Sequence, residues 1–155
     1  MTIRFTLVTL IAAAPEDVFD LSLDTGLHLR SMRGYAEELL SVDPGRLLTV
    51  GDEVTWRARH FGVRWTMTDR LTELERPSRF VDEQVRGPFA SFHHVHEFAG
   101  DTAGTGTVMT DHITFDAPLS ILGDAVERLV LARRMRHLIS VRNAHLKHEC
   151  EQPRP

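Results

Sequence analysis

Residues 53–74, EVTWRARHFGVRWTMTDRLTEL, carry the pattern from which the architecture of this 155-residue chain can be predicted. Apolar and polar side chains alternate along residues 53–60 and again along residues 63–74, and the dipeptide Phe61-Gly62 separates the two runs. Such alternation is typical of a half-buried strand, and a two-residue interruption that contains glycine favours a hairpin. The stretch therefore predicts two antiparallel strands of a sheet that has one apolar face and one solvated face.

The two faces of this predicted hairpin differ in chemistry. Two indoles and a thioether on the apolar face suit a flat apolar ligand, and a plain core role is the alternative interpretation. An unpaired acid on that face is costly, so Asp69 either points into the interior with a partner or lies in water at the rim. The apolar face holds Val54, Trp56, Ala58, His60, Val63, Trp65, Met67 and Asp69, and the other face holds Thr55, Arg57, Arg59, Arg64, Thr66, Thr68 and Arg70.

The elements outside the hairpin follow in a simple order: a strand, short helices, a meander of strands and one long helix. Because strands and helices do not alternate, a doubly wound parallel sheet is excluded. We expect an α+β fold in which a curved antiparallel sheet of six or seven strands wraps on a long C-terminal helix, with two short helices after the first strand. The other strands are predicted at residues 2–10, 80–86, 90–98 and 107–115.

Helix boundaries are indicated by proline and glycine. Pro15 suits the first helical position, and Gly26 is expected to end or break that helix before a second one near residues 27–32. A long helix is predicted from Pro118 to about residue 147. Since only this helix can cover a bent sheet, we expect a ligand cavity between the two. Its apolar stripe comprises Leu122, Val126, Leu129, Val130, Met135, Leu138 and Val141.

Composition excludes several classes of protein. Hydrophobic residues make up 42% and charged residues 26% of the chain, which excludes a disordered protein. A formal net charge of −4 provides no positive field, so we expect no nucleic-acid partner. The single cysteine, Cys150, excludes an intrachain disulfide and a cysteine-rich metal centre. No signal peptide or membrane span is recognised, so we expect a cytoplasmic protein without integral membrane contact, built as one domain over residues 1–150 with a disordered tail at 151–155.

Five segments carry a resemblance to a known family. Together with the order of elements, they make the whole chain similar to the START-like (SRPBCC) superfamily, which has the helix-grip fold, and within it to the polyketide cyclase/dehydrase-like branch. The resemblance implies a deep pocket for an apolar or aromatic small molecule, in proteins that range from carriers to cyclases and aromatases. The segments are APEDVFDL (14–21), GDEVTW (51–56), FVDEQVRGPF (80–89), HVHEF (94–98) and MTDHI (109–113).

The most informative polar cluster lies in the last two predicted strands. His94 and His96 share a strand face, and Asp111 lies on the matching face of the next strand. One register places His94 opposite Asp111, and a register shifted by two residues places His96 there. Such a group could be a buried pair that fixes register, a ligand contact, or an acid–base pair in which Asp111 orients the imidazole.

The His94-x-His96 spacing also suits metal chelation, because alternate residues of a strand project together. With Asp111 it would give a set of two histidines and one carboxylate. Spacing fixes no further ligand, so we expect no metal and no cofactor.

The remaining candidates would line the pocket. Gln84 could offer its amide to a ligand carbonyl, and Gly87-Pro88 is expected to bend the sheet. The resemblance implies that His28 lies at the pocket mouth. The predicted ligand-binding residues are Trp56, Trp65, Met67, Gln84, Phe92, Met109, Phe115, His28, His60 and Asp69, and the predicted polar anchors or catalytic residues are His94, His96 and Asp111.

Three functions are compatible with these features. The first is binding of an apolar or aromatic small molecule, such as a lipid or a polyketide-like compound. The second is a cyclase or dehydratase that needs only proton transfer by a His–Asp pair on a carbonyl substrate, without a cofactor. The third is a protein–protein interaction module that uses the basic outer face. A homodimer is a possible oligomeric state.

Overall fold

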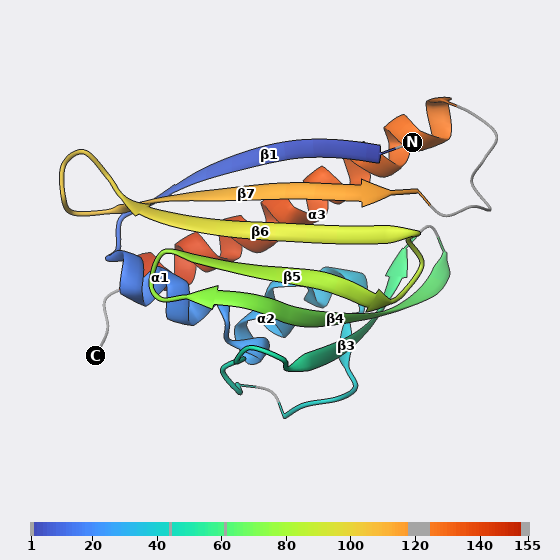
Figure 1. The fold of residues 1–155 in the computed structure, drawn as a ribbon, viewed down its shortest axis with the longest axis horizontal. Coiled ribbons are helices and arrows are strands. Elements are labelled where there is room, and N and C mark those ends of the chain that lie inside the picture. The colour runs from blue at the N-terminus through green and yellow to red at the C-terminus, as the bar shows by residue number, and fades with distance from the viewer. Residues whose placement is uncertain (1, 44, 61, 118–124, 153–155) are drawn as a thin grey trace.

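The computed structural model describes residues 2–43, 45–60, 62–117 and 125–152, and in it a bent antiparallel sheet lies across a long helix (Figure 1). The helix-grip architecture predicted from the sequence is confirmed. The helices are α1 (Pro15–Ser22), α2 (Thr25–Ser31) and α3 (Ala125–Glu151), with a 3-10 turn η1 (Arg33–Tyr35). The strands are β1 (Thr2–Ile11), β2 (Glu38–Leu39), β3 (Glu53–His60), β4 (Val63–Glu75), β5 (Arg79–Arg86), β6 (Ser91–Gly100) and β7 (Thr107–Asp116).

The seven strands form one sheet in the order β1-β7-β6-β5-β4-β3-β2. Strand β2 contributes only two residues, which is too short for an alternating pattern to reveal. Helix α3 runs behind β1, β7 and β6 in Figure 1 and contacts β1, α1 and α2. The helices therefore cover one face of the sheet and leave the other face to solvent.

The register of β6 and β7 is the second of the two that the sequence allows. His96 pairs with Asp111, and His94 pairs with Ile113. In the β3–β4 hairpin, Trp56 pairs with Met67, as the alternation predicts. Gly62 has a positive φ of 77°, which explains why glycine occupies this tight turn.

The apolar core consists of two clusters. One contains Phe19 of α1 with Phe80 and Phe98 of the sheet, and the other contains Phe92 and Phe115 of the sheet with Leu131 of α3, among other residues. Along β6, the two histidines lie between Phe92 of one cluster and Phe98 of the other. The polar residues therefore occupy the gap between two apolar cores.

Helix α3 differs from the predicted one in two respects. Leu129 and Val130, expected on the apolar stripe, are 51% and 45% exposed, whereas Leu131, which the stripe omitted, is buried; Leu138 is buried as expected. The side chains of Leu122 and Val126 lie outside the described residues. The helix also continues to Glu151, whose Oε1 accepts a hydrogen bond of 2.8 Å from the backbone N–H of Ala12.

The sequence suggested that Gly26 ends or breaks the first helix, but this prediction is wrong. Helix α1 ends at Ser22, and Gly26 lies inside α2. The Asp24 carboxylate accepts hydrogen bonds from the N–H groups of Gly26 and Leu27 and so begins the second helix. A Cβ atom on Gly26 would lie 2.9 Å from the backbone nitrogen of Gly45. The glycine is therefore required by the close approach of another segment.

Candidate functional site

A cavity of about 200 Å³ lies between the inner face of strands β3 to β6 and helices α2 and α3. Its walls are mostly apolar, with a small number of titratable side chains among them. Of the residues predicted from the sequence, those that line it are His28, Trp56, Trp65, Met67, Asp69, Phe92, His94 and His96.

Met109 and Phe115 belong to the core and not to the cavity, which corrects the prediction for both. Each is 0% exposed on β7, a strand that lies between β1 and β6 on the side of the sheet that α3 crosses. The side chains of the two core clusters fill the space there. Asp111 is likewise fully buried and lies behind the two histidines.

Gln84 faces the interior but does not line the cavity. Its Nε2 donates a hydrogen bond of 2.8 Å to the carbonyl of Phe89, and its Oε1 accepts one of 3.3 Å from the N–H of the same residue. The amide therefore holds the bend at Gly87-Pro88, and both of its polar atoms are used there. The side chain of His60 lies outside the described residues.

Asp111 is the centre of a buried polar network. His94 Nε2 lies 2.8 Å from Asp111 Oδ1, and Asn143 Nδ2 of α3 donates a hydrogen bond of 2.6 Å to Oδ2. Burial opposes the charge on this carboxyl, but hydrogen bonds from His94 and His96 outweigh it and hold the pKa of Asp111 well below its usual range. The side chain is therefore a buried carboxylate with partners on both oxygens.

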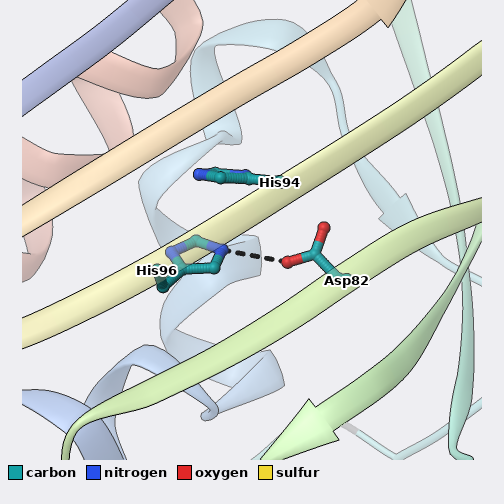
Figure 2. A group of neighbouring side chains, drawn as sticks. All are labelled: Asp82, His94 and His96. Atoms are coloured by element: carbon teal, nitrogen blue, oxygen red, sulfur yellow. Dashed lines mark hydrogen bonds and ion pairs between the residues drawn. The ribbon is translucent and has the colours of Figure 1, made fainter.

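His96 lies between two carboxylates. Its Nε2 forms a hydrogen bond of 2.9 Å with Asp82 Oδ2 (Figure 2), and its Nδ1 makes an ion-pair contact of 2.9 Å with Asp111 Oδ1. Burial favours the neutral ring, but the two carboxylates outweigh it and raise the pKa of His96. Because Nδ1 makes no hydrogen bond within the described residues, its contact with Asp111 acts through charge, and both carboxylates favour the protonated ring.

His94 has the opposite character, although its ring centroid lies 3.7 Å from that of His96. Burial and the positive charge of His96 lower the pKa of His94, so the neutral ring is favoured. When Nε2–H donates to Asp111, Nδ1 carries a lone pair, and it has no hydrogen bond to any described residue. Because His94 lines the cavity, its lone pair is available to a ligand.

Two acids of the cavity have different environments. Burial opposes the charge on Asp82, but the hydrogen bond and positive charge of His96 outweigh it and lower the pKa of Asp82. Burial, together with repulsion from Asp82 and Glu37, raises the pKa of Asp69 well above its usual range. Asp69 Oδ1 has no accessible surface and no hydrogen bond within the described part of the chain.

Sequence reasoning missed Asp82, Asn143 and Arg142, the last a buried arginine that lines the cavity and donates a hydrogen bond of 3.3 Å from Nη2 to the carbonyl of Ser22. The facing of β5 was ambiguous, because Val81 and Val85 indicated one face and Phe80 the other. In the structure Phe80 is buried against Phe19, and Asp82, two residues further, lines the cavity. Phe80 was thus the residue that could have indicated the inward face of β5. Nothing in the helical pattern of α3 distinguishes Asn143 from its solvent-facing polar neighbours.

His28 lines the cavity, and its side chain is 27% exposed. Its Nε2 lies 3.1 Å from Glu37 Oε1, and its ring lies 4.2 Å from that of Trp56. These contacts join α2 to the segment that precedes β2.

One ring nitrogen of His94, one of His96 and a carboxylate oxygen of Asp82 lie within 4.8 Å of one another, close enough for one cation. Asp82 thus stands where the sequence had suggested Asp111. In this arrangement each nitrogen of His96 lies 2.9 Å from a carboxylate oxygen, so a metal ion would have to displace a proton from that ring in order to bind.

Comparison with known proteins places the chain in a family. A model described as polyketide cyclase / dehydrase and lipid transport matches residues 2–151. The chain belongs to this family. No curated protein sequence matches it.

Solved structures of this family's fold are similar over nearly the whole chain. CV1439 from Chromobacterium violaceum has a TM-score of 0.69 at 18% identity, covering 97% of this chain and 98% of that one. Ginseng major latex-like protein 151 from Panax ginseng has a TM-score of 0.65 at 16% identity, covering 97% and 99%. The di-domain ARO/CYC BexL from the BE-7585A biosynthetic pathway has a TM-score of 0.73 at 19% identity, with 99% of this chain matching 51% of that one.

None of the described helices combines the length and the apolar character needed to cross a membrane.

Proposed function

We propose that this family member binds an apolar or aromatic small molecule, of lipid or polyketide-like type, in the cavity between the sheet and α3. The observation that carries the proposal is a cavity walled by Trp56, Trp65 and Met67 with His94 among its polar lining residues. A flat apolar ligand would gain from contact with both indoles, and one polar group on it could meet His94. The family, described by cyclase, dehydrase and lipid transport roles, supports the same class of ligand.

A thermal-shift screen of apolar and aromatic compounds tests this function. A ligand at roughly 100 times its dissociation constant should add about 2.7 kcal/mol to the free energy of unfolding. Stabilisation should be lost in Ala58→Phe, which places a ring in the cavity, and kept in Val8→Phe, which places one on the exposed face. Failure of every apolar class to stabilise the protein would contradict the proposal.

The second candidate function is proton-transfer catalysis on a carbonyl substrate, as in a cyclase or dehydratase. One observation favours it: His94 lines the cavity, Asp111 fixes its Nε2, and its Nδ1 has no hydrogen bond to a described residue. Such a base could remove a proton from the carbon next to a carbonyl group. The third hypothesis, an interaction module, is weakened by the cavity, and several arginines of the outer face, such as Arg57 and Arg70, already pair with acids.

Deuterium exchange separates catalysis from binding. The methyl protons of 2-acetylnaphthalene exchange slowly in D2O, and a base in the cavity should accelerate the exchange. His94→Ala should abolish the acceleration while the ketone still binds. An exchange rate equal to that of buffer in the wild type would leave binding as the function. A cytoplasmic location, the lack of a nucleic-acid partner and a homodimer stay predictions.

A further inference from the structure

Asp69 lines the cavity, but no described residue forms a hydrogen bond with its buried Oδ1. It lies on β4 between Met67 and Leu71, whose side chains also line the cavity. Its backbone pairs with Val54 of β3 and with Gln84 of β5, and the register of the β4–β5 ladder shifts between Thr68 and Asp69. Such irregularities change the direction of a strand locally and are common beside functional sites.

The polar side chains near Asp69 form hydrogen bonds or ion pairs with residues other than Asp69. Gln84, directly opposite, uses both ends of its amide on the backbone of Phe89. The nearby acids, Asp82 and Glu37, pair with His96 and His28. Within the described residues, therefore, no hydrogen bond reaches either oxygen of Asp69, and its Oδ1 is sealed from solvent.

The charge of its surroundings decides the state of this side chain. An ionised carboxyl here would face two other acids in a half-buried apolar wall, so the protonated form is favoured. A protonated carboxyl has one O–H donor, and a donor without an acceptor carries an unrecovered desolvation cost. With Oδ1 sealed, the O–H belongs on Oδ2, where a molecule in the cavity can accept it.

We propose that Asp69 is a hydrogen-bond donor that selects, among flat apolar ligands, those that carry an uncharged oxygen acceptor such as a ketone or ester carbonyl. Asp69 can act in this way only if the cavity binds a ligand, so the inference rests on the proposed function. A carboxylate group placed directly at Asp69 is disfavoured, because Asp82 and Glu37 are the charged groups that act on this position. An analogue without the oxygen would leave the donor unsatisfied, and sites of this kind discriminate strongly against such analogues.

Two probes of nearly equal shape test the proposal: 2-acetylnaphthalene, and 2-isopropenylnaphthalene, in which a CH2 group replaces the carbonyl oxygen. Isothermal titration of the wild type should show the ketone binding about tenfold more tightly. Asp69→Leu should bind both probes with nearly equal affinity. Asp69→Asn, which keeps an N–H donor, should retain part of the preference. Thr66→Leu, an exposed position of the same strand, should retain all of it.

The outcomes separate the two proposals. Equal binding of both probes by the wild type would overturn the role of Asp69 and leave the proposed function intact. A preference that persists in Asp69→Leu would also overturn it. Binding of neither probe would overturn both. If Asp69→Leu does not fold, the wild-type affinity ratio and its change in Asp69→Asn still decide the question.

Discussion

Two regions of the interior place acids near aromatic residues, one behind the cavity wall and one in it, and the surroundings of the two acids differ. On β6 and β7, Asp111 is surrounded by His94, His96 and Asn143, so its charge is compensated by partners from the protein. On β4, Asp69 has no such partner and has acids as neighbours. A buried acid with partners in the protein can stabilise the fold without a ligand. A buried acid without such partners is explained more simply if a bound ligand supplies the missing hydrogen bond.

The largest expected effect is on the compensated region. Asp111→Ala would leave His96 buried with one carboxylate fewer and should lower the free energy of unfolding by about 3–5 kcal/mol, as when one partner of a buried ion pair is removed. Urea unfolding measures the change, and Asp43→Ala, at an exposed aspartate, is the control. A loss below about 1 kcal/mol would mean that the network contributes little to stability.

The uncompensated region should respond in the opposite direction. Because the folded-state pKa of Asp69 lies above the ordinary value of 3.8, stability from this group is present below pH 3.8 and is lost as the pH rises through the folded pKa. Asp69→Leu removes this loss, so its stability relative to wild type should increase with pH, by roughly 1–3 kcal/mol at neutral pH. A destabilised Asp69→Leu across the whole pH range would indicate a hidden partner.

The pKa values of the two histidines should be shifted in opposite directions from the ordinary value of 6.5, upward for His96 and downward for His94. Nitrogen NMR should find His96 protonated on both nitrogens above that pH and His94 neutral below it. Asp82→Asn should lower the pKa of His96, because one of its two carboxylates is lost. Since the folded-state pKa of His96 is raised, its contribution to stability is complete below pH 6.5 and disappears as the pH rises through the folded value. Coincident titration near 6.5 would contradict the assigned charges.

The smallest effect is expected at Gln84, whose side chain joins the bend before β6. Gln84→Ala should lower the free energy of unfolding by about 1 kcal/mol through loss of these bonds and leave the affinity for 2-acetylnaphthalene unchanged. A weaker affinity without a change in stability would return Gln84 to the set of ligand-binding residues.

Much of the fold was predictable because strand alternation assigns each side chain to a face. Trp56, Trp65 and Met67 were placed on one wall by that rule alone. The register of β6 and β7 was not predictable, since a shift of two residues preserves every facing and only changes which histidine meets Asp111. Asn143 depends on how α3 packs, and the partnerless state of Asp69 depends on what Gln84 and Asp82 bind, neither of which is a property of local sequence.

The central claim is that the interior between the sheet and α3 contains a cavity that binds a small-molecule ligand. A crystal structure of the protein with 2-acetylnaphthalene tests it most directly. We predict electron density for the ketone between Trp56 and His94, with its oxygen toward Asp69. Density confined to the surface, or a cavity closed by the protein's own side chains, would contradict the claim.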